Sequence, residues 1–127
     1  MNYNELNDKL KEINTEDYIW IIYVGIIFLS WYSNNLERRY FIYNDQECKE
    51  KYRKIIIIIF SILLVVYTYF FKSSLDDVIN IKNTTKIKKI KLTELSSIAS
   101  LLILLSGIIF LYIAFVDDNL DVELAFN

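Results

Sequence analysis

The charged residues of this chain avoid three long apolar blocks. Residues 18–33, 55–71 and 95–116 contain no Asp, Glu, Lys or Arg, so all 14 basic and 16 acidic residues lie outside them. As helices, these blocks of 16, 17 and 22 residues would extend about 24, 26 and 33 Å, against a hydrocarbon core of about 30 Å in a bilayer. The pattern predicts an all-α integral membrane protein with three transmembrane helices, at about 18–33, 55–71 and 95–116.

The composition of the blocks supports this prediction. The second block holds thirteen Ile, Leu, Val or Phe residues, which favour insertion by on the order of 4–8 kcal/mol at helix-centre values. A soluble fold is the alternative, and residues 55–59 alone could form a buried strand. Such a core needs amphipathic partners, whereas the remaining segments are short and strongly charged. Aromatic rings, which prefer the headgroup level, lie toward the ends of the first block at Tyr18, Trp20, Tyr23, Trp31 and Tyr32.

The polar N-terminal segment has its own helical pattern. Leu6, Leu10 and Ile13 recur at helical spacing, and Asn2 with Glu5 fits a helix cap. We expect a short amphipathic helix at the membrane surface, with a solvated tail as the alternative. The segment is mostly acidic and no small-residue cleavage site follows it, so the first block is expected to be retained and not removed as a signal peptide.

Turn and cap signals separate the first two blocks. Asn34-Asn35 is a turn signal. Asn44 with Glu47 reads as a capping box that starts the second helix near Asp45, and Glu47 with Lys51 is an i,i+4 ion pair. The second helix is expected to run to about residue 71.

The segment before the third block is the hardest to interpret. Residues 78–92 fit a small β-hairpin, although the turn lacks Gly and the alternation slips at Lys88-Lys89. They fit a basic surface helix almost as well. Thr93 is a plausible cap for the third helix, which should end near Asp117. No repeat or flexible linker is evident, so residues 1–127 are expected to form a single membrane domain.

The positive charges do not fix the orientation of the chain. The four segments outside the blocks carry 2, 6, 6 and 0 Lys or Arg residues in chain order. With three alternating spans, the two basic loops lie on opposite sides, so neither orientation satisfies the positive-inside rule. A re-entrant first or second block would let both loops share one side.

Residue types that carry chemistry are scarce. The chain has no His and one cysteine, Cys48, which is interpreted as an incidental thiol. We expect no metal, no cofactor and no catalytic site. No ionisable residue falls inside a block, which argues against a pump or a secondary transporter. A solvated tail explains the acidic residues after the third block, Asp117, Asp118, Asp121 and Glu123.

Small residues predict where helices pack. Ser100, Gly107 and Ala114 repeat every seven residues in the third block, and small residues let membrane helices approach closely. The partner could be the first or second helix of the same chain, or another copy. Basic residues flanking the blocks are candidates for contact with anionic lipid headgroups: Arg38, Arg39, Lys86, Lys88, Lys89 and Lys91.

These features predict a small non-enzymatic membrane protein, an accessory or structural subunit that contacts the lipid bilayer and another membrane protein or itself. Neither nucleic acid nor a small-molecule substrate is expected. In size, three predicted spans and charged termini the chain also resembles holin-type membrane-permeabilising proteins, but its acidic C-terminal end departs from their basic tail. The Ile, Asn, Lys and Tyr bias is typical of an AT-rich genome, bacterial or viral, and a bacterial cell membrane is the expected location.

Overall fold

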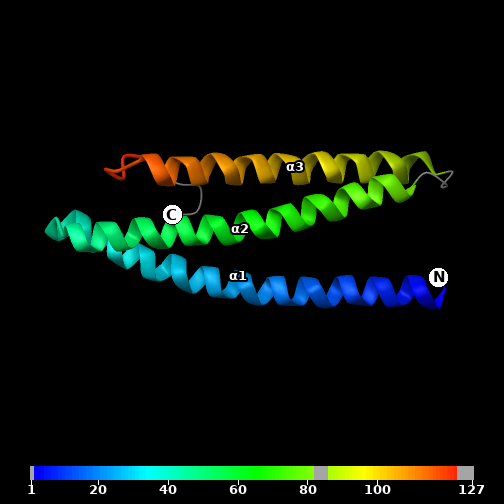
Figure 1. Ribbon diagram of the computed structural model, residues 1–127, viewed down its shortest axis with the longest axis horizontal. Helices are drawn as coiled ribbons and strands as arrows, with labels where there is room; N and C mark the ends of the chain where they lie inside the picture. Colours follow the sequence, from blue (N-terminus) through cyan, green and yellow to red (C-terminus); the bar gives the residue numbers. More distant parts are fainter. Residues whose placement is uncertain (1, 82–85, 123–127) are drawn as a thin grey trace. The chain divides into compact units, whose positions relative to one another are not determined.

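The computed structural model describes residues 2–81 and 86–122, and within these the chain forms three helices, α1 (Tyr3–Tyr43), α2 (Gln46–Asn80) and α3 (Ile87–Val116) (Figure 1). No strand occurs among the described residues. All three helices are long and apolar enough to cross a membrane. Contacts group the chain into two units, residues 1–52 and 53–127.

The first unit consists mainly of α1, which begins at a capped turn. The side-chain oxygen of Asn2 accepts a hydrogen bond from the Glu5 amide at 2.8 Å, as the cap prediction required. From there α1 runs for 41 residues without a break. The polar N-terminal segment is therefore not a separate surface helix but the first four turns of α1.

Asn34-Asn35 does not form the predicted turn, because α1 passes through it. Asn is only a weak helix breaker, less favourable than Ala by well under about 1 kcal/mol, and neither Gly nor Pro is nearby. The Asn35 side chain instead accepts a hydrogen bond from Nη1 of Arg38 at 3.0 Å, one helical turn away.

Two residues connect α1 to α2. Asn44 ends α1 in the left-handed region at φ 53°, which a short polar side chain tolerates. Asp45 then caps α2, accepting hydrogen bonds from the amides of Glu47 at 3.0 Å and Cys48 at 3.4 Å. The predicted cap at Asn44 is thus wrong by one residue, whereas the Glu47–Lys51 ion pair is confirmed at 3.5 Å.

The second unit contains most of α2 and all of α3. The predicted β-hairpin at 78–92 is not formed: α2 continues to Asn80, and α3 is helical from Ile87, while residues 82–85 lie outside the described part. Without a Gly turn or strict alternation, the helical spacing of Ile87 and Ile90 prevails.

The predicted end of α3 is confirmed, but its predicted start is wrong. The helix starts at Ile87, so Thr93 is not its cap; the Thr93 hydroxyl donates to the Lys89 carbonyl at 2.8 Å inside the helix. The predicted end near Asp117 is confirmed, since the Asp117 amide makes the last helical hydrogen bond, 2.8 Å to the carbonyl of Ile113.

Candidate functional site

An antiparallel seam joins α2 and α3 within the second unit. Figure 1 shows α2 and α3 side by side and running in opposite directions. The Phe60 and Phe110 rings stack at 5.6 Å between centroids. Nearer the loop, the hydroxyl oxygens of Ser74 and Ser100 lie 2.9 Å apart. The apolar blocks of α2 and α3 therefore lie beside each other.

The three predicted packing residues lie at intervals along the same face of α3. Ser100 is half-buried and contacts α2 through Ser74, while Gly107 and Ala114 are buried. A Cβ atom at Gly107 would lie 3.1 Å from Cδ2 of Tyr67 and 3.2 Å from Cδ2 of Leu64. Unstrained carbon contacts are about 3.5–4.0 Å, so the approach of α2 and α3 at this point depends on glycine.

Three hydroxyl groups within the apolar blocks donate to carbonyls of their own helices. Ser61 donates to the carbonyl of Ile57, and Thr68 donates to the carbonyl of Leu64, both at 2.7 Å. On α1, Ser33 donates to the carbonyl of Ser30 at 2.7 Å. These bonds let hydroxyl side chains reside in apolar surroundings without an unsatisfied donor.

Arg53 links α2 to the end of α3 in the helical hairpin that these two helices form, at the end of the hairpin opposite its loop. Its Nη2 atom donates to the backbone carbonyl of Phe115 at 3.1 Å and lies 2.9 Å from the Asp118 carboxylate. Sequence reasoning missed this cluster, since it treated Arg53 as one of several loop cations. The sequence does contain a signal for this contact, because Arg53 lies just before the second block and Asp117 and Asp118 lie just after the third. An antiparallel pair of helices brings these positions together.

Just after α3, the side chain of Asp117 bonds to backbone amides of the residues that follow it. Its carboxylate accepts hydrogen bonds from the amides of Asp121 at 3.0 Å and Val122 at 2.8 Å. Burial alone raises the pKa of Asp117, but these amides and that of Asn119 outweigh it and hold the pKa below its ordinary value of 3.8. Asp117 is thus a local cap and Asp118 pairs with Arg53, whereas Glu123 lies outside the described residues.

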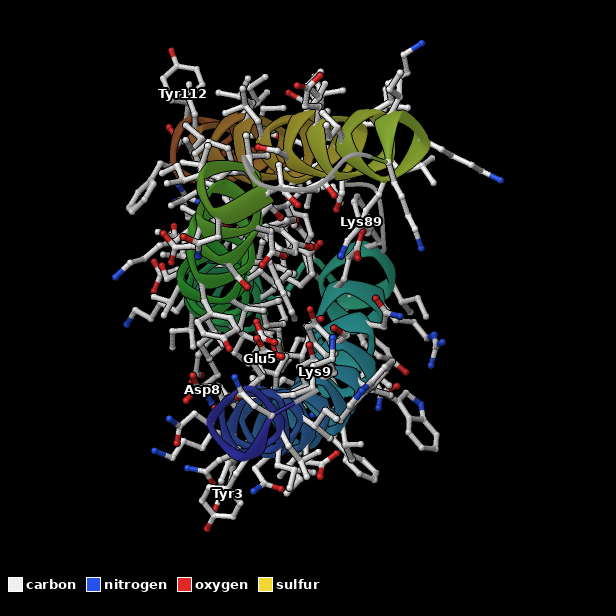
Figure 2. All side chains as sticks on the ribbon, turned by 90° about the vertical axis from the view of Figure 1, so that its right-hand side faces the viewer. Tyr3, Glu5, Asp8, Lys9, Lys89 and Tyr112 are labelled. Carbon is white, nitrogen blue, oxygen red and sulfur yellow. The ribbon has the colours of Figure 1, made fainter. Side chains whose placement is uncertain are left out.

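At the loop end of the hairpin, α2 and α3 border an open groove of about 740 Å³. Three of the predicted headgroup residues, Lys86, Lys88 and Lys89, line it, whereas Lys91 is exposed and not part of its lining. Figure 2 shows Lys89 and Tyr112 extending from different sides of α3. The remaining lining residues are Ser74, Asp77, Ile87, Leu92, Thr93 and Ser96.

The other two predicted headgroup residues belong to the first unit. Arg38 and Arg39 are exposed on the last turns of α1. Close to them in sequence, the Lys49 ammonium lies 5.4 Å from the centroid of the Tyr40 ring, a cation–π contact. Basic and aromatic side chains thus accompany the α1–α2 connection, an arrangement suited to a membrane–water interface.

Comparisons with family models, curated proteins and solved structures give no match for this chain. Among the described residues, no group of three His, Cys, Asp or Glu side chains could hold a metal ion. The candidate features are the α2–α3 seam around Gly107, called the glycine seam, the lysine-lined groove, and the exposed apolar side chains at the start of α1.

Proposed function

We propose that this chain is a small, non-enzymatic, multi-pass membrane protein that acts as an accessory or structural subunit by binding a protein partner. The three long apolar helices support residence in a bilayer. The close approach of α2 and α3 at Gly107 supports helix packing inside the bilayer. A bacterial cell membrane and an AT-rich genome, whose typical residue bias the sequence has, are part of the proposal.

One observation carries the role of a protein partner: an exposed apolar stripe on the N-terminal part of α1. Tyr3, Leu6, Leu10 and Ile13 are 81%, 46%, 50% and 44% exposed. Their spacing is that of the a and d positions of a heptad, the pattern by which helices pack against each other. Full burial of such a side chain contributes about 1.5–3 kcal/mol, so the stripe offers substantial binding energy to a helical partner.

The continuity of α1 makes lipid a poor cover for this stripe. A helix lying in the membrane surface would need a sharp turn near residue 17 before the apolar block begins, and α1 is unbroken from Tyr3 to Tyr43 (Figure 1). Residues 3–17 therefore continue the direction of the block and project roughly 22 Å beyond it at about 1.5 Å per residue. A partner protein can reach the stripe there.

The test replaces the stripe and, separately, the opposite face of the same turns. A photo-crosslinking residue at Leu10 should give one discrete adduct in cells, whose mass shows whether the partner is another protein or a second copy. Leu6→Ser, Leu10→Ser or Ile13→Ser should weaken the complex isolated in gentle detergent. The matched controls Asn4→Ser, Asp8→Ser and Lys11→Ser alter exposed polar positions of these turns and should leave it intact. A monomer that gives no adduct would refute the proposal.

A further inference from the structure

The lysine-lined groove lies at the ends of the apolar blocks of α2 and α3, and all of its lining residues except Ser96 are outside the blocks. Ser74 and Asp77 follow the end of the α2 block by three and six residues, and Lys89 precedes the start of the α3 block by six. At about 1.5 Å per residue, these positions are roughly 5–9 Å beyond the blocks. This inference rests on the membrane residence proposed above, which puts the groove at the depth of lipid headgroups.

Lys89 is on the packing face of α3, not on a face turned away from the hairpin. It precedes Gly107 by 18 residues, which is five turns at 3.6 residues per turn. Because Gly107 is in contact with α2, Lys89 continues the same face beyond the end of the seam and lines the groove. Lys91, two residues on, is rotated away by about 160° when each residue turns the helix by about 100°.

The charges and donors of the groove suit a phosphate group. Three lysines and Asp77 give the lining a net charge of +2. Ser74 donates to the Phe70 carbonyl at 2.9 Å and Thr93 to the Lys89 carbonyl. The lysine ammonium groups, with three N–H donors each, are the charged donors that an anion would meet.

The groove also has an apolar side. Leu92 lines it three residues nearer to the α3 block than Lys89 and is 56% exposed. A free phosphate ion would leave this side chain in water, whereas an amphiphile with its phosphate at Lys89 would cover it with its glycerol and first methylene groups. Ammonium donors with apolar surface on their membrane side favour a lipid over a soluble anion.

We propose that this groove binds the phosphate group of an anionic phospholipid, with Lys89 as the principal contact and Lys86 and Lys88 as supporting cations. The site holds a lipid between the last turns of α2 and the first turns of α3. It selects lipids by headgroup charge, which is a property separate from binding of a protein partner by α1.

The experiment measures lipid selectivity with the full chain reconstituted in phosphatidylcholine vesicles. Electron paramagnetic resonance of spin-labelled phosphatidylglycerol and spin-labelled phosphatidylcholine gives the relative affinity of each lipid for the protein. We expect a preference for phosphatidylglycerol that falls about fivefold in Lys89→Gln, the factor corresponding to about 1 kcal/mol for one cation at the headgroup. Lys91→Gln removes the same charge from the same helix outside the groove and should retain the preference, as should Lys89→Arg.

Each other result has a distinct meaning. Equal selectivity in the wild type, Lys89→Gln and Lys91→Gln proteins, all firmly in the vesicles, overturns the groove site alone. Loss of the preference on adding millimolar inorganic phosphate at constant ionic strength shows an anion site and overturns the assignment to a lipid. Release of the wild-type protein from vesicles by alkaline carbonate overturns membrane residence, and this proposal with it. Helical circular dichroism of the variants confirms that they are folded.

Discussion

Replacing Gly107 by leucine should open the α2–α3 hairpin. A Cβ atom alone would lie 3.1 and 3.2 Å from side-chain carbons of Tyr67 and Leu64, inside the about 3.5–4.0 Å of an unstrained contact. Leucine adds three further carbons at the same place. Overpacking of this kind costs typically about 1–3 kcal/mol, and we expect the hairpin to lose stability by that amount. Gly107→Ala should have a smaller effect, because the ends of both neighbouring side chains can shift by a few tenths of an ångström.

The assay follows separation of the hairpin ends opposite the loop. Dyes attached to Lys54→Cys and Val116→Cys, both exposed positions, in a Cys48→Ser background report energy transfer while sodium dodecyl sulfate is titrated into a mild detergent. Gly25→Leu is the matched control, because nothing lies within 4 Å of a Cβ atom there. If Gly107→Leu and Gly25→Leu shift the midpoint equally, the argument that the seam depends on glycine is wrong.

Three further outcomes follow from the described contacts. Arg53→Met should lower hairpin stability by about 1–2 kcal/mol in the same titration, since it removes a charged hydrogen bond to a carbonyl; Asp118→Asn should cost less, because Asp118 is 77% exposed. A hydrogen bond from the Cys48 thiol, with those of two amides, holds the pKa of Asp45 below its ordinary value of 3.8. The cap should therefore stabilise α2 fully above pH 4 and weaken as the pH falls further. The measurement is amide hydrogen exchange in the first turn of α2, corrected for the intrinsic exchange rate, which should become faster at low pH. Asp45→Asn should abolish this pH dependence. Single cysteines at Asn2, Glu50, Asn80 and Asp121, each in a Cys48→Ser background, report the side of the membrane through an impermeant maleimide. If all three helices cross the membrane, these sites should alternate along the chain between reactive and unreactive in intact cells.

The apolar blocks were predictable because long uncharged stretches rich in Ile, Leu and Val satisfy a criterion that depends only on local sequence. The helix ends were harder. Propensity changes little across Asn34-Asn35, so a turn signal there competed with continued helix, and the helix prevailed. At Asn44 and Asp45 two adjacent residues can both cap, and only the backbone conformation assigns the left-handed position to Asn44.

Contacts distant in sequence were the least predictable. Arg53 reaches Phe115 across 62 residues, and no periodicity encodes which loop cation makes such a bond. The small-residue spacing singled out Gly107 as a packing position, but its neighbours Tyr67 and Leu64 could be identified only from the structure. Likewise, the sequence shows that lysines precede the third block. That Lys89 lines the groove and Lys91 does not depends on the face of the helix each residue occupies, which only the structure gives.

The unbroken path of α1 has a mechanical consequence. A continuous 41-residue helix is about 60 Å long at about 1.5 Å per residue, and it contains no hinge to absorb a displacement. A force that tilts the exposed N-terminal turns by about 10° would swing the other end of a rigid rod of this length by on the order of 10 Å. Trp20 and Trp31, which are 66% and 67% exposed, are suited to resist that motion as interfacial anchors. If the apolar block of α1 lies in a bilayer as proposed, binding at one end of α1 would thus act as a lever on that block.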